Sequence, residues 1–152
     1  MLGKLTRWLR MLGHNVKYSN DLDDSQLIAI AKKEGRILLT RDLELYQHAT
    51  AKGIKAFYVK GQTEAEELAR LSKKFRIKLD IDMATSRCPK CNTRVKAIVK
   101  EKVEDKVEKT TFSHYNAFWE CPGCGKIYWQ GAHWTRIRKT LETALKNLRE
   151  LN

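Results

Sequence analysis

Leucine recurs at helical spacing over the first twelve residues of the chain, at positions 2, 5, 9 and 12. Residues three and four apart lie on one face of an α-helix, so this pattern predicts an amphipathic helix, and Gly13 is suited to end it. Similar spacing predicts helices over 25–34, 43–52 and 63–75. Asp23 with Gln26, and Thr63 with Glu66, match the capping box that often opens a helix.

Short apolar runs alternate with these helices. Residues 37–40 and 54–59 form continuous apolar runs, which are typical of strands buried on both faces, and 15–19 is a third strand candidate. Alternating strands and helices predict an α/β domain over 1–85, built as a parallel three-layer sheet with right-handed crossovers.

The second half of the chain has shorter elements. Residues 76–87 are predicted to be a connector, and strands are expected at 95–99 and 126–129. The charges of residues 100–109 nearly cancel, which predicts a solvated loop or a hairpin tip there. The segment 136–152 predicts an amphipathic helix whose apolar face comprises Ile137, Leu141, Ala144, Leu145, Leu148 and Leu151. Such a helix serves docking or self-association, so a homodimer through it is one expected partnership.

All four cysteines lie in two Cys-Pro-x-Cys segments, as Cys88, Cys91, Cys121 and Cys124. Four thiolates complete the tetrahedral shell of a structural Zn²⁺ site and leave no open position for chemistry. We therefore predict a zinc ribbon over 86–135. Iron in the same shell, redox chemistry and two disulfides are the alternatives. Residues 1–13 contain no apolar core long enough for a signal peptide, because Lys4, Arg7 and Arg10 interrupt it, and this disfavours disulfides.

The chain carries 30 Lys and Arg against 18 Asp and Glu, a formal charge of +12, and both halves are basic. A basic folded protein favours a polyanionic partner, most often a nucleic acid. Lys4, Arg7 and Arg10 form a stripe along the first predicted helix, either a phosphate-contacting or a merely solvated face. No run approaches the roughly 20 apolar residues of a membrane span, so a cytoplasmic protein without membrane contact is expected.

Acidic side chains follow two predicted strands, as Asp21, Asp23 and Asp24 after the first and Asp42 after the second. Parallel α/β sheets place their sites at these strand ends, and gathered carboxylates suit Mg²⁺ or Mn²⁺. Such an ion beside a basic surface suits phosphodiester hydrolysis. The alternative is that these residues only cap helices. Trp119, Trp129 and Trp134 flank the ribbon and form either its small core or a base-stacking platform.

Several segments together match the motifs of a known family. They are 2–13, 23–27, 35–42, the Ser86-Arg87-Cys88 segment and 118–134, whose sequence is FWECPGCGKIYWQGAHW. In these segments the chain resembles the Mut-seven C-terminal ribonuclease family. The resemblance implies a PIN-like nuclease fold followed by a zinc ribbon. It also implies metal-dependent ribonuclease activity, with the family acids falling on Asp24 and Asp42 and with Asp21 as a weaker supporting acid.

Family members usually open with a strand that ends in an aspartate, before the helix that here spans 2–12. This strand and its carboxylate are expected to be missing from the present sequence, which would leave two of three acids. Two alternatives to a nuclease therefore remain open. One is a non-catalytic zinc-ribbon RNA-binding protein, and the other is a partner-binding protein of a toxin–antitoxin type.

Overall fold

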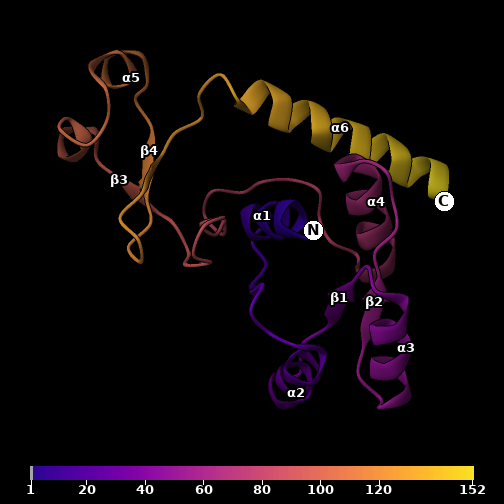
Figure 1. Cartoon of the computed structure of the whole chain (residues 1–152). Coiled ribbons are helices and arrows are strands. Elements are labelled where there is room, and N and C mark those ends of the chain that lie inside the picture. The colour runs from indigo at the N-terminus through magenta and orange to yellow at the C-terminus, as the bar shows by residue number, and fades with distance from the viewer. Residues whose placement is uncertain (1) are drawn as a thin grey trace.

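The computed structural model describes residues 2–152 as helices with two small sheets (Figure 1). The N-terminal half contains α1 (Gly3–Met11), α2 (Asp24–Glu34), β1 (Leu38–Thr40), α3 (Leu43–Ala51), β2 (Ala56–Tyr58) and α4 (Glu64–Phe75). The rest contains β3 (Lys96–Ile98), the 3₁₀ helix η1 (Lys100–Val103), α5 (Lys109–His114), β4 (Phe118–Glu120), β5 (Ile127–Tyr128) and α6 (Trp134–Leu151). Over the described residues, no helix is both long and apolar enough to cross a membrane.

The predicted α/β character is confirmed, with a small parallel sheet. Strands β1 and β2 pair in parallel, with Leu38 opposite Ala56 and Thr40 opposite Tyr58. The two faces of this sheet meet different clusters, because Leu38 packs with α2 and α3 whereas Leu39 and Phe57 pack toward α1 and α4. Two paired strands do not by themselves define a PIN-like sheet.

The strand expected at 15–19 is wrong, since this segment has no regular secondary structure. Its backbone bonds to side chains instead of to a neighbouring strand. The Val16 N–H donates to the Asn92 side chain at 3.1 Å, and the Val16 carbonyl accepts from Arg10. Side chains can provide the hydrogen-bond partners that a neighbouring strand would otherwise supply to the backbone.

The helix boundaries follow the predicted caps. Asp23 and Gln26 form a complete capping box, with the Gln26 N–H donating to Asp23 at 2.8 Å and the Asp23 N–H donating to Gln26 at 2.9 Å. Thr63 accepts from the Glu66 N–H at 3.2 Å, but the Glu66 carboxylate accepts from Gln62, so only half of the second box forms.

The main hydrophobic core joins α1, α4 and α6. Its most buried members include Leu5, Leu68, Leu71, Leu141 and Ala144. Helix α6 lies across the end of α4 in Figure 1, and the predicted apolar face therefore docks on its own chain. Leu145 alone among the large apolar side chains of α6 is exposed, at 37%. Self-association through this helix stays a prediction.

The ribbon sheet has the antiparallel order β3-β4-β5, with Trp119 of β4 opposite both Ala97 and Tyr128. Strands β3 and β5 confirm the prediction, whereas β4 and α5 were not predicted. The expected solvated loop over 100–109 is wrong in its centre, because Val103 is fully buried against Phe118 and Ile127. The near-neutral charge of this segment did not indicate that one of its valines, Val103, belongs to the ribbon core.

Replacing Leu141 with alanine is expected to lower the free energy of unfolding by about 2–5 kcal/mol, because it opens a cavity between α6 and the main core. The matched variant Leu145→Ala alters an exposed position of the same helix and is expected to change it by no more than about 0.5 kcal/mol. Urea unfolding followed by circular dichroism measures both. Equal losses in the two variants would contradict the assigned packing of α6.

Candidate metal centre and acidic edge

The two cysteine segments form the same backbone turn. In the first, the Asn92 N–H donates to the Cys88 carbonyl at 2.8 Å, and in the second the Gly125 N–H donates to the Cys121 carbonyl at 2.7 Å. Both closing residues have a left-handed backbone, with φ of 75° at Asn92 and 78° at Gly125. Asparagine tolerates this conformation better than most residues, which is why the two turns can share one geometry.

This repeated turn brings four sulfur atoms together. All four Sγ atoms lie within 4.8 Å of one another, with Cys88 and Cys124 at 3.8 Å and Cys91 and Cys121 at 3.2 Å. A tetrahedral zinc with bonds of about 2.3 Å separates its sulfurs by about 3.8 Å. The cysteines are free thiols, and within residues 2–152 they are the one group of three or more metal-ligand side chains so gathered. The set fits a structural zinc ion.

The thiols differ in their electrostatic surroundings. Hydrogen bonding with the side chain and backbone of Thr93 lowers the pKa of Cys91 to about 6, whereas burial raises the pKa of Cys121 to about 12. The hydroxyl of Tyr128 lies 2.9 Å from the Cys88 sulfur, and burial together with this contact raises the pKa of Tyr128. Tyr128 therefore stays protonated and can donate to a Cys88 thiolate.

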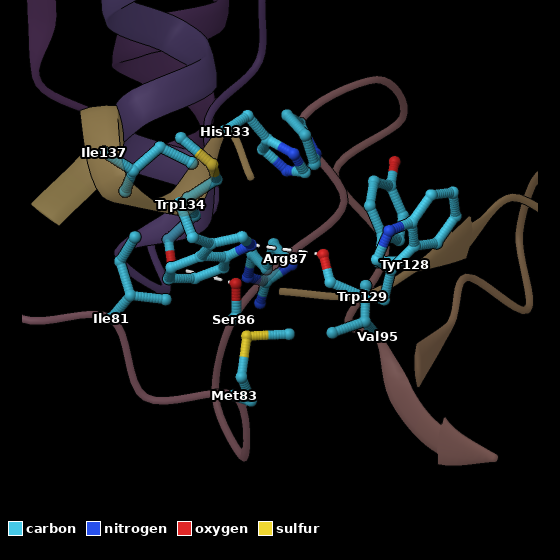
Figure 2. A pocket seen from close by; sticks show the side chains of 12 residues that line it. Ile81, Met83, Ser86, Arg87, Val95, Tyr128, Trp129, His133, Trp134 and Ile137 are labelled. Atoms are coloured by element: carbon cyan, nitrogen blue, oxygen red, sulfur yellow. Dashed lines mark hydrogen bonds between the residues drawn. The ribbon is translucent and has the colours of Figure 1, made fainter. Parts of the chain in front are cut away.

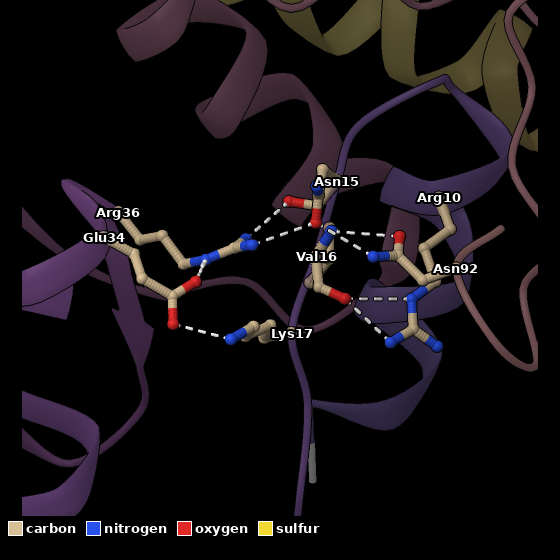
Figure 3. Close-up of polar contacts among 7 residues, drawn as sticks. All are labelled: Arg10, Asn15, Val16, Lys17, Glu34, Arg36 and Asn92. Carbon is tan, nitrogen blue, oxygen red and sulfur yellow. Dashed lines mark hydrogen bonds and ion pairs between the residues drawn. The ribbon is translucent and has the colours of Figure 1, made fainter. Parts of the chain in front are cut away.

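Arg10 connects the first knuckle to the helical half, and Figure 3 shows its contact with Val16. Its guanidinium donates to the Val16 carbonyl at 2.7 and 3.1 Å and to the Pro89 carbonyl at 3.0 Å. Burial lowers the pKa of Arg10, and the nearby thiols of Cys88 and Cys91 oppose that shift. The sequence predicts Lys4, Arg7 and Arg10 on one phosphate-contacting or solvated face. Lys4 and Arg7 are exposed, but Arg10 is buried and its guanidinium bonds to carbonyls inside the protein.

A polar network extends from this point to the end of α2 (Figure 3). The Asn92 amide donates to the Asn15 side chain at 2.9 Å, and Arg36 donates to the same oxygen at 3.1 Å. Glu34 accepts from Arg36 and Lys17, and these contacts lower the pKa of Glu34. The loop predicted to be a strand is therefore a joint between α2 and the metal centre.

The predicted catalytic acids are all exposed and lie at helix starts or in the preceding loop. Asp42 follows β1 and caps α3, with one carboxylate oxygen accepting from Glu44 at 2.9 Å and from Leu45 at 3.3 Å. Asp24 is the first residue of α2, whose cap is the neighbouring Asp23. Asp21 lies in the preceding loop. The described residues do not gather these three acids into one metal-ligand group.

Two acidic residues near this edge escaped the sequence analysis. Glu67, in the first turn of α4, is buried and accepts from the guanidinium of Arg41, the residue before Asp42. Glu64 accepts from the indole N–H of Trp8. The sequence signal is the group of three glutamates after Thr63, of which the capping pattern accounts only for Glu66.

Comparison with known families gives a match to the model of the Mut7-C RNAse domain over residues 1–141. The chain belongs to this family. The matched range includes both cysteine knuckles and all three predicted acids, and it ends inside α6. Neither the curated proteins nor the solved structures contain a match to this chain.

Purified protein is expected to contain about one zinc ion per chain, because four thiolates form one closed tetrahedral shell. Elemental analysis measures this ratio, and Cys121→Ser should release the ion and abolish the native near-ultraviolet circular dichroism of the ribbon aromatics. Zinc has a filled d shell and gives a colourless protein. A coloured protein with stoichiometric iron would instead identify the competing metal.

Arg10→Gln is expected to lower the free energy of unfolding by about 1–3 kcal/mol, since buried carbonyls at Val16 and Pro89 lose their donor. Arg7→Gln, one position of the same helix exposed to solvent, should change it by no more than about 0.5 kcal/mol. Urea unfolding of the zinc-loaded proteins compares the two. If both variants unfold alike, Arg10 does not join the two halves of the chain.

Proposed function

We propose that this chain is a metal-dependent endoribonuclease that hydrolyses phosphodiester bonds of RNA, on a PIN-like α/β domain over 1–85 joined to the zinc ribbon over 86–135. The observation that carries the proposal is the family match over 1–141, because the family is an RNAse domain. The net charge of +12 supports a polyanionic substrate.

Asp24 and Asp42 are the proposed ligands of a catalytic Mg²⁺ or Mn²⁺, with Asp21 in support. Helix α2 packs on β1 and is joined to it by only three residues, so both proposed ligands belong to elements of the same small sheet region. Only one carboxylate oxygen of Asp42 caps α3, and Asp23, not Asp24, caps α2. The second oxygen of Asp42 and the carboxylate of Asp24 are therefore not used in capping. Magnesium commonly takes one or two carboxylates and completes its shell with water and substrate phosphate.

The divalent ion would supply an activated water and neutralise charge on the phosphate. The chain's own residues would hold the ion and orient the RNA. Lys4 and Arg7, both exposed on α1, are the proposed phosphate contacts, and Arg10 is excluded from that role by its internal hydrogen bonds. The zinc would stabilise the ribbon, because its four thiolates leave no coordination position for substrate.

One observation favours the non-catalytic alternative, in which the protein only binds RNA. The side chain of Asp42 caps α3, and this structural role explains its position without a divalent ion. The exposed Leu145 similarly leaves open a partner-binding protein of a toxin–antitoxin type. RNA cleavage by the unmodified protein and by Asp42→Asn distinguishes both alternatives from a nuclease.

Asp42→Asn is expected to lower the rate of Mn²⁺-dependent RNA cleavage by about a hundredfold or more, because several kcal/mol of metal-derived stabilisation are lost and each 1.4 kcal/mol is tenfold. Asparagine is as good an N-cap as aspartate, so the fold should persist. Labelled single-stranded RNA, with Mn²⁺ added or withheld, measures cleavage without a chelator that would also strip zinc.

Asp23→Asn is the matched control, since it makes the same change at a neighbouring acid whose carboxylate only caps α2. It should cleave RNA like the unmodified protein. Cleavage that survives in Asp42→Asn would place the active site elsewhere. Undiminished RNA binding without cleavage by the unmodified protein would favour the non-catalytic alternative.

A further inference from the structure

An aromatic cavity of about 200 Å³ lies where the ribbon, the connector and the ends of α1 and α6 meet (Figure 2). Its lining is almost wholly apolar and includes Met11, Met83, Val95, Tyr128, Trp129 and Trp134. Segments from both halves of the chain build it. The cavity is distinct from the acidic strand edge, which shares none of its lining residues.

The two indoles of this cavity are held in place by local structure. The indole N–H of Trp134 donates to the Trp129 carbonyl at 3.2 Å (Figure 2). A Cβ atom at Gly131 would lie 2.9 Å from the Trp129 indole nitrogen, so glycine is needed where the chain passes that ring. Rigid aromatic walls lose little conformational entropy when a flat ligand enters.

Arg87 supplies a hydrogen-bond donor that the protein does not use. One terminal nitrogen donates to the Asn92 carbonyl at 3.0 Å, which fixes the side chain. Its Nε atom is buried, and within residues 2–152 it is the one buried side-chain nitrogen or oxygen without a hydrogen-bond partner. Among the lining residues that the structure describes, Arg87 is also the one Lys or Arg, so its side chain is the cationic group beside a ligand in this cavity.

Exposed basic residues lie close to the cavity along α6. Ile137 lines the cavity from the first turn of this helix, and Arg136, Arg138 and Lys139, its neighbours in sequence, are exposed. Aromatic stacking faces combined with basic side chains that follow the backbone are the arrangement used to bind single-stranded nucleic acid.

We propose that this cavity binds one unstacked nucleobase of single-stranded RNA, with the base stacked on the aromatic walls beside Arg87 and the adjoining phosphates reaching Arg136 and Arg138. The inference rests on the proposed function, since it supplies a subsite for the RNA substrate. A cavity of about 200 Å³ is smaller than the roughly 300–1,000 Å³ of drug-sized ligand sites, which suits a single base and not a whole nucleotide. The subsite fixes where RNA lies relative to the acidic edge.

The test uses the full, zinc-loaded chain and fluorescence anisotropy of a labelled single-stranded RNA, measured without Mg²⁺ or Mn²⁺ so that no cleavage occurs. Met83→Phe fills the cavity with a larger apolar side chain and should weaken binding about tenfold, while the urea midpoint stays the same or rises. Trp129→Leu removes a wall and should weaken binding similarly. Tyr18→Leu removes an aromatic side chain that is 39% exposed outside the cavity and should leave affinity unchanged.

An RNA with a single abasic position, scanned along the strand, identifies the bound base. An abasic site at one position should lower the RNA affinity of the unmodified protein about tenfold. The same abasic site should not lower the affinity of Met83→Phe further, because both changes remove the same contact. If Met83→Phe is stable and binds RNA like the unmodified protein, the cavity is only a packing gap and the inference fails. The absence of any RNA binding overturns it as well.

These results are separable from the test of catalysis. Loss of binding in the cavity variants, in a protein that never cleaves RNA, supports the subsite and overturns the nuclease. Normal binding and cleavage in the same variants overturns the subsite and leaves the nuclease standing.

Discussion

The buried guanidinium of Arg10 is the contact on which the arrangement of the two halves depends. It comes from α1, at the centre of the main hydrophobic core, and donates to the Val16 loop and to the Pro89 carbonyl in the first cysteine knuckle. A planar group with five donors can satisfy several carbonyls at once, which lysine cannot do. The nearby thiols of Cys88 and Cys91 favour its charge against the cost of burial.

This junction explains why the cysteine centre and the helical half form one structure. A zinc ion on the four thiolates would retain a net negative charge of about two, and Arg10 interacts electrostatically with two of these thiols, Cys88 and Cys91. Asn92 has two roles, since its left-handed backbone closes the first knuckle and its side chain bonds to the loop at Asn15 and Val16. Loss of the metal would therefore loosen a loop that lies far away in sequence.

The proposed functions occupy opposite sides of this junction. The acids Asp24 and Asp42 belong to the small parallel sheet and its helices, whereas the aromatic cavity is assembled from the ribbon, the connector and α6. Lys4 and Arg7 of α1 are exposed and belong to neither site. On this view the ribbon contributes to substrate position through its packing and not through its metal.

Local signals in the sequence determined the helices, their caps and the metal ligands, because each depends on residues close together in the chain. The Asp23 capping box, the strands at β1 and β2 and the four cysteines are examples. The segment 15–19 failed as a strand because a strand requires a neighbour, and Asn92 and Arg10 bond to its backbone in place of one. The use of Arg10, the burial of Val103 and the cavity around Trp129 were decided only by tertiary structure. Each of these results from contacts between residues distant in the chain, which no local pattern records.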